Sequence, residues 1–146
     1  MSGFYEPPPA FSSPFRDRLL HPKWDMIAER LGRPVPGILQ ELYGRPDLVL
    51  RSHFRISPPG GGAELWLDLF LPMDEEALAP DGLTLPAGAL AFADDEHGDP
   101  YFYLPDTTLA GDGPVYLMQR HRGGETVLPV AASLATFLAW ERRQSS

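Results

Sequence analysis

The sequence predicts an α+β domain in which a single curved antiparallel β-sheet packs against N-terminal helices and a C-terminal helix. Apolar residues recur with a helical period near both ends of the chain and with a period of two in the segments between them. Short loops rich in glycine and proline separate the strand-like segments, whereas parallel strands would need long crossover connections. Helices segregated from a run of short strands are typical of the α+β class.

Helices are predicted at three places. In the first, residues 22–31, four apolar side chains share one face: Trp24, Ile27, Ala28 and Leu31. Gly32 follows this helix and is suited to a left-handed cap. A second helix covers residues 36–43, and a third begins after Ser133, a favourable N-cap residue. Trp24 and Trp140 fall on helices and are assigned to the core.

Six short strands are predicted between these helices. They cover residues 52–56, 65–71, 89–93, 101–104, 114–119 and 126–128. In the second of them leucines alternate with Trp66, Asp68 and Phe70. We therefore expect the leucines on one face of the sheet and these three residues on the other.

The length of 146 residues allows one domain with a substantial core. Residues 1–20 hold a run of three prolines and are predicted to form a Pro-rich, partly flexible arm before a single domain at residues 21–146. The absence of cysteine excludes disulfide scaffolds, cysteine nucleophiles, zinc ribbons and iron–sulfur sites. No run approaches the roughly 18 apolar residues of a membrane span and no signal-peptide pattern is present, so we expect a cytoplasmic protein.

The charge is negative and unevenly distributed. A net charge of −8 disfavours phosphate backbones and anionic lipid, so neither nucleic acid nor a membrane is expected as a partner. Residues 61–113 hold twelve Asp or Glu and no Lys or Arg, while the flanking segments are mildly basic. Such a span is either a well-solvated face or a surface that meets a basic partner.

Motifs of catalysis are absent from the sequence. It contains no G-x-S-x-G, no phosphate-binding loop ending in Gly-Lys-Ser/Thr and no H-E-x-x-H, and its four histidines lie far apart. The densest group of possible metal ligands is Asp94–Asp99, which lacks the spacing of a calcium-binding loop. We predict an acidic turn between two strands there, with no metal and no cofactor. A small metal-dependent hydrolase built on this turn is the alternative.

An aromatic side chain surrounded by carboxylates is the best binding hypothesis. Tyr101, Phe102 and Tyr103 are consecutive in a strand, so their rings fall on both faces of the sheet and at least one is expected to point away from the core. If the second face is also packed, the rings are structural, whereas an exposed ring would anchor an interface. The predicted partner surface consists of Asp94, Asp95, Glu96, Asp99, Tyr101, Tyr103 and Asp106.

Five segments occur in a recognisable order along the chain. They are a helix pair joined at residues 32–36, an acidic hairpin at 85–99, the aromatic strand 101–103, the segment Gly-Pro-Val-Tyr at 113–116 and a helix at 132–138. In this order they resemble the SUKH superfamily, the Smi/Knr-like proteins, over roughly residues 22–140.

The resemblance implies an α+β fold with one antiparallel sheet, no catalytic residues, no cofactor and protein binding as the activity. Bacterial members of the superfamily resemble immunity proteins that neutralise a cognate toxin, often a nuclease. Fungal relatives act as regulatory adaptors in cell-wall synthesis. We therefore expect a non-enzymatic immunity protein of toxin–antitoxin type that binds a basic toxin domain, with a regulatory adaptor as the alternative. The oligomeric state stays open.

Overall fold

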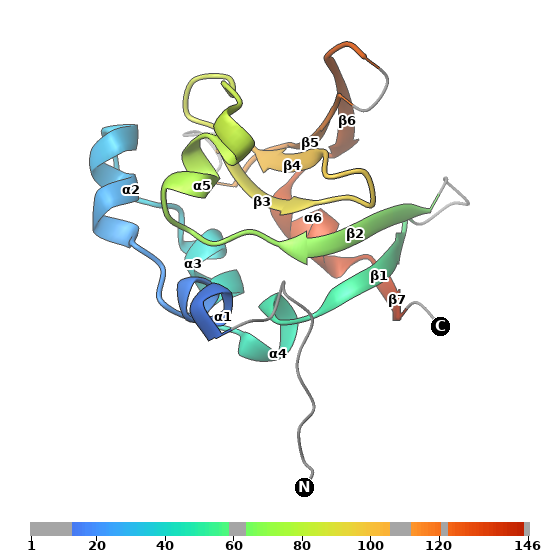
Figure 1. Ribbon diagram of the computed structural model, residues 1–146, viewed down its shortest axis with the longest axis horizontal. Coiled ribbons are helices and arrows are strands. Elements are labelled where there is room, and N and C mark those ends of the chain that lie inside the picture. Colours follow the sequence, from blue (N-terminus) through green and yellow to red (C-terminus); the bar gives the residue numbers. More distant parts are fainter. Residues whose placement is uncertain (1–12, 59–63, 106–111, 121–122, 145–146) are drawn as a thin grey trace, which may run out of the picture.

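The computed structural model describes residues 13–58, 64–105, 112–120 and 123–144, and it confirms the α+β class (Figure 1). Seven antiparallel strands form one sheet in the order β6-β5-β4-β3-β2-β1-β7. The strands are β1 (Ser52–Ser57), β2 (Leu65–Phe70), β3 (Leu90–Asp94), β4 (Pro100–Tyr103), β5 (Val115–Gln119), β6 (Thr126–Ala131) and β7 (Glu141–Gln144). The first six follow one another as a meander, and β7 returns to the edge beside β1.

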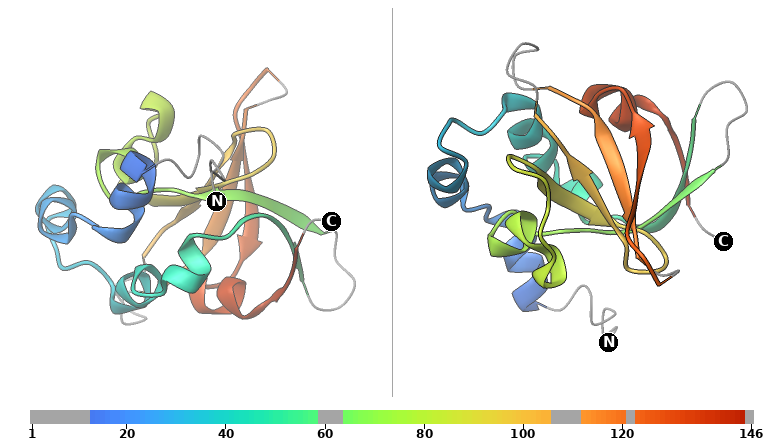
Figure 2. Two further views of the ribbon diagram at one scale, coloured as in Figure 1. Left: turned by 60° about the horizontal axis from the view of Figure 1, so that its bottom comes forward. Right: turned by 90° about the horizontal axis from the view of Figure 1, so that it is seen from above.

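Helices lie before the sheet, between β2 and β3, and between β6 and β7. They are α1 (Ser13–Leu20), α2 (Trp24–Leu31), α3 (Gly37–Tyr43), α4 (Pro46–Val49), α5 (Glu75–Leu78), the 3-10 helix η2 (Pro80–Gly82) and α6 (Leu134–Ala139). The three helices predicted from the sequence are confirmed as α2, α3 and α6. Figure 2 shows α3, α4 and α6 on one side of the sheet. The larger apolar cluster, which we call the main core, is formed by side chains of the helices and the sheet, and it buries Leu39, Val49 and Phe137.

Helix α1 lies within the arm that the sequence predicts for residues 1–20. Its Leu19 is 1% exposed and packs in the main core. Burying one leucine side chain contributes about 1.5–3 kcal/mol, which favours the docked helix. Through Leu19, α1 packs against the rest of the described domain. The rest of the predicted arm, residues 1–12, lies outside the described residues.

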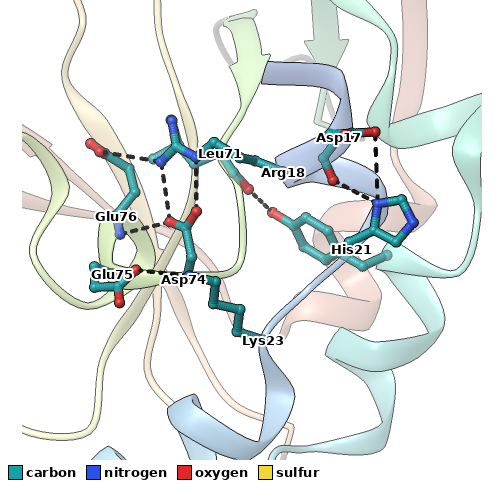
Figure 3. A network of polar contacts seen from close by, with 9 residues as sticks. Asp17, Arg18, His21, Lys23, Leu71, Asp74, Glu75 and Glu76 are labelled. Carbon is teal, nitrogen blue, oxygen red and sulfur yellow. Dashed lines mark hydrogen bonds and ion pairs between the residues drawn. The ribbon is translucent and has the colours of Figure 1, made fainter. Parts of the chain in front are cut away.

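A network of charged side chains joins α1 to the start of α5 (Figure 3). Arg18 donates from Nε to Asp74 Oδ2 at 2.8 Å and from Nη2 to Asp74 Oδ1 at 3.2 Å. Asp74 also caps α5, because its Oδ1 accepts the backbone N–H of Glu76 at 2.9 Å. Burial raises the pKa of Asp74, but the hydrogen bonds from Arg18 and Glu76 and the positive charges of Arg18 and Lys23 together outweigh burial, so this pKa lies below its usual value.

Aromatic side chains fix α6 and α3 against the sheet. Phe137 of α6 packs on Phe92 and Tyr101, with ring centroids 5.5 and 5.7 Å away. The hydroxyl of Tyr43, at the end of α3, lies 2.5 Å from the carbonyl of Leu71 and 3.1 Å from that of Phe92. One side chain thus ties a helix to the end of β2 and to β3.

The alternation predicted for the second strand breaks within β2. Leu67 and Phe70 are 0% and 2% exposed in the same core, although strict alternation places them on opposite faces. Leu71 lies in a separate apolar cluster. The prediction that the leucines share one face is therefore wrong at the end of the strand. At this point the backbone N–H of Leu69 donates to the carboxylate of Asp94 at 3.0 Å.

This second, smaller apolar cluster lies on the face of β3, β4 and β5 that is turned away from the main core. Its buried members are Leu71, Ala89, Ala91, Phe102 and Met118. Leu83 and Leu85, from the segment between η2 and β3, pack against it. Both faces of β4 are therefore covered by apolar side chains.

Replacing Tyr43 with phenylalanine removes the hydroxyl that joins α3 to the sheet. We expect Tyr43→Phe to lower the free energy of unfolding by about 1–2 kcal/mol, because a buried carbonyl loses its hydrogen bond. Urea denaturation followed by circular dichroism measures this change. Tyr116→Phe is the matched control, since Tyr116 is only partly buried and stacks on Phe102. Equal stabilities of the two variants would contradict the assigned role of Tyr43.

The ion pair between Arg18 and Asp74 also has a measurable consequence. We expect Arg18→Met to lower the free energy of unfolding at neutral pH by about 1–2 kcal/mol, compared with Arg16→Met on the exposed side of the same helix. Because the pair lowers the pKa of Asp74, its contribution is present above the pKa of an unfolded aspartate and is lost as the pH falls through the folded pKa. If Arg18→Met is still less stable than Arg16→Met at pH 2, where Asp74 is protonated, the ion pair is not the cause of the difference.

Candidate functional site

The acidic turn between β3 and β4 is closed by the side chain of Asp95. Its Oδ1 accepts the backbone N–H groups of His97 and Asp99, both at 2.9 Å, and the residue is 7% exposed. Gly98 adopts a φ of 78°, which glycine reaches without strain. The acidic turn predicted from the sequence is present, and Asp95 acts within it as an acceptor for the backbone.

Asp99 connects this turn to β5. The residue is 1% exposed, and its Oδ1 accepts the backbone N–H of Arg120 at 3.0 Å. The guanidinium of Arg120 lies over the turn, with Nη2 3.4 Å from the carbonyl oxygen of Gly98 and 3.8 Å from Asp81 Oδ2. Asp99 is therefore placed where it holds the hairpin against the neighbouring strand.

Asp94 is the last residue of β3, immediately before the turn, and its side chain contacts β2. Its Oδ1 accepts the backbone N–H of Leu69 at 3.0 Å, and the residue is partly buried. Burial raises the pKa of Asp94 to about 7, and the nearby charges of Asp68 and Asp95 add to the rise while the Leu69 hydrogen bond opposes it. This carboxyl group therefore changes its charge near neutral pH.

Backbone capping is a general use of the acidic residues in the span 61–113. Asp112 accepts from the backbone N–H groups of Gly113, Leu134 and Ala135, so it caps the start of α6. In the described part of this span, six acidic side chains accept a backbone N–H: Asp74, Glu76, Asp94, Asp95, Asp99 and Asp112. Much of the negative charge that the sequence concentrates here thus serves the fold.

Tyr101 and Tyr103, two members of the predicted partner surface, are buried, as the packed-face alternative requires. Tyr101 and Tyr103 are 1% and 0% exposed in the main core, and the Tyr101 hydroxyl donates to the carbonyl of Trp66 at 2.7 Å. Phe102 points to the other face, as alternation predicts, but the second cluster covers it. Neither tyrosine ring is open to a partner in this conformation. Asp106, the last member of the predicted surface, lies outside the described residues.

The exposed carboxylates of this region lie around the turn and α5. Glu96 is the predicted site residue whose side chain is open to solvent, at 57% exposed. Asp81 is 84% exposed and lies with Glu76 and Asp94 on a shallow hollow of about 230 Å³ beside the turn, and the cation of Arg120 lines the same hollow. Glu75 is also exposed on α5. We call Glu75, Glu76, Asp81, Asp94 and Glu96 the acidic surface.

The carboxylates of the turn are directed mainly at backbone N–H groups. Within the ranges that the structure describes, no group of three or more His, Asp or Glu could hold a metal ion. The inner carboxylates, Asp95 and Asp99, point at backbone N–H groups and are buried.

Across the same ranges, no helix combines the length and apolar character needed to cross a bilayer.

An open groove of about 710 Å³ lies between α3, α4 and α6. Its lining is mostly apolar and includes Ile38, Leu48 and Leu138, with Glu41 and Arg45 as its charged residues. This composition suits contact with an apolar surface more than acid–base or nucleophilic chemistry.

The sequence did not mark several of the solvent-facing residues near the turn as part of a binding surface. Glu75, Glu76 and Asp81 belong to the acidic span, but their sequence carries no periodic signal that separates exposed acids from capping acids. Trp66 lies opposite the leucines in the second predicted strand, and this alternation is the signal that could have marked it as outward-facing.

Comparison with known proteins gives one match. The model of the SMI1 / KNR4 family (SUKH-1) matches residues 23–140, which is most of the chain. No curated protein and no solved structure matches significantly.

Asp94→Asn should change how stability depends on pH. In the folded protein the pKa of Asp94 is about 7, above that of an unfolded aspartate, so the folded state binds this proton more tightly. The resulting stability is complete below about pH 4 and is lost as the pH rises through about 7. Between pH 5 and pH 8, the free energy of unfolding of the unmodified protein should fall by roughly 2 kcal/mol more than that of Asp94→Asn. Urea denaturation at the two pH values measures this difference. A difference that is constant with pH would refute this assignment.

Proposed function

The chain belongs to the SMI1 / KNR4 family (SUKH-1), and from this membership we propose that it is a non-enzymatic protein-binding module. More specifically, we propose an immunity protein that binds and neutralises a cognate basic toxin domain in the cytoplasm. The observation that carries this proposal is the acidic surface beside the β3–β4 turn.

The charge of this surface supports a basic partner. Asp81 and Glu96 are well exposed, and the protein as a whole carries a net charge of −8. Complementary charge accelerates association and disfavours wrong partners. A toxin that acts on nucleic acid must present cations to phosphate groups, and exposed carboxylates can occupy those same cations.

The fold gives the acidic surface a fixed shape. Asp95 and Asp99 hold the turn through backbone hydrogen bonds, and Arg18 and Asp74 hold the start of α5. We therefore propose that Glu96 and Asp94 contribute directly to the partner surface. In the same proposal Asp95, Asp99, Tyr101 and Tyr103 contribute by supporting its shape.

The first test isolates the partner and asks whether it is toxic. The immobilised protein is incubated with lysate of the source organism at low salt, and bound proteins are eluted with a salt gradient and identified by mass spectrometry. We expect one basic protein to elute late, its expression alone to stop growth, and co-expression with this chain to restore growth. A partner without toxicity would overturn the immunity proposal in favour of an adaptor. Recovery of no specific protein would count against both.

The second test asks whether the acidic surface is the binding site. The triple variant Glu75→Gln, Asp81→Asn, Glu96→Gln should associate with the recovered partner about tenfold more slowly at low salt, because electrostatic steering is weakened. The matched control carries Glu29→Gln, Glu41→Gln and Asp47→Asn, which remove the same charge from exposed positions on α2, α3 and α4. Surface plasmon resonance measures both rates. Equal slowing by the two variants would show that net charge acts without a defined acidic site.

A further inference from the structure

The β1–β2 hairpin presents a tryptophan on the face of the sheet turned away from the main core. Phe54 and Ile56 are buried in that core, so Arg55 between them points to the opposite face. Trp66 is directly opposite Arg55 in the β1–β2 register and is partly exposed. Trp24 and Trp140, by contrast, pack against the main core, as predicted from the sequence.

Arg55 shows within the chain which kind of group this ring binds. Its guanidinium carbon lies 5.7 Å from the centre of the Trp66 ring, within the range of a cation–π contact. Nη1 of Arg55 is also 3.6 Å from Glu64 Oε1. The Arg55 side chain is 53% exposed, so it can move into solvent and leave the ring and the carboxylate to another cation.

A shallow hollow of about 280 Å³ surrounds this contact. It is lined by Arg55, Glu64, Leu65, Trp66 and Glu96. Glu96 comes from the β3–β4 turn, so the hollow extends to the acidic surface. Two carboxylates and one guanidinium give it a formal charge of −1, and one further cation complements it. Tryptophan and arginine are enriched among the residues that dominate protein–protein binding.

We propose that this hollow, which we call the Trp66 receptor, binds an arginine or lysine side chain of a protein partner. The incoming cation stacks on the Trp66 ring and pairs with Glu64 and Glu96, as Arg55 already does in part. The proposal deepens the proposed function, on which it rests, by naming the chemistry of the partner residue. It also assigns the aromatic contact with the partner to Trp66, which is partly exposed, and not to the buried Tyr101 and Tyr103.

Nuclear magnetic resonance of the three tryptophan indole N–H groups tests the receptor with a defined probe. The folded protein is titrated with the peptide acetyl-Gly-Arg-Gly-Arg-Gly-amide and separately with the same peptide carrying citrulline for arginine. We expect a saturable shift of the Trp66 indole that is at least three times larger than that of Trp24 or Trp140. The citrulline peptide should give no saturable shift, because it has the shape of arginine without the charge. No shift, or equal shifts of all three indoles, would overturn the proposal.

Two variants locate the contact. Glu96→Gln should weaken binding of the arginine peptide at least threefold, whereas Glu29→Gln, an exposed acid on α2, should leave it unchanged. Trp66→Leu should abolish the saturable binding, measured by fluorescence anisotropy of a labelled peptide, while its far-ultraviolet circular dichroism stays the same. If Trp66→Leu does not fold, the Glu96→Gln comparison still decides. Equal affinity of both glutamate variants would overturn the receptor.

The same variants separate this proposal from the proposed function. If the toxic partner binds but neither Glu96→Gln nor Trp66→Leu changes its affinity, the receptor is wrong and the immunity function stands. If the peptide binds at Trp66 but no toxic partner is recovered, the immunity function is wrong and the receptor stands.

Discussion

Backbone N–H groups at the ends of strands and helices need acceptors, and in this protein carboxylates supply many of them. Asp95 closes the β3–β4 turn, Asp99 joins that turn to β5, and Asp112 caps α6. A buried N–H without an acceptor costs about 1–3 kcal/mol, so these carboxylates have more effect on stability than solvated surface charges. The placement of the hairpin, of α5 and of α6 depends on them.

This constraint divides the acidic residues into two groups. Of those that accept backbone N–H groups, Asp95 and Asp99 are buried and determine the shape of the turn. Those that point outward, such as Asp81 and Glu96, lie around the same turn and stay well exposed, although Asp81 is 3.8 Å from Arg120 and Glu96 is 3.7 Å from His97. Asp94 belongs to both groups, because it bonds to Leu69 and also lines the hollow beside Asp81. Buried carboxylates that accept backbone N–H groups thus lie beside a set of exposed ones, and our proposed function assigns the exposed set to a basic partner.

The distribution of aromatic side chains follows from the two covered faces of the sheet. Tyr101 and Tyr103 face the helices, and Phe102 faces the second apolar cluster, so β4 has no open face. Trp66 is not a member of that second cluster and lies on the same face of the β1–β2 pair as Arg55. A partly exposed ring next to charged groups is suited to contact with a partner, whereas the β4 rings stabilise the core.

The sequence by itself determined the α+β class, the helices α2, α3 and α6, the positions of the first six strands along the chain and the family. These features rest on local periodicity and on motifs within short segments. It did not indicate α1, whose helix depends on Leu19 and Arg18 meeting distant groups, or β7, whose four polar residues show no alternation. It also could not separate capping acids from exposed ones. Asp94 and Asp112 find their N–H donors 25 and 22 residues away, and only the tertiary structure brings such groups together.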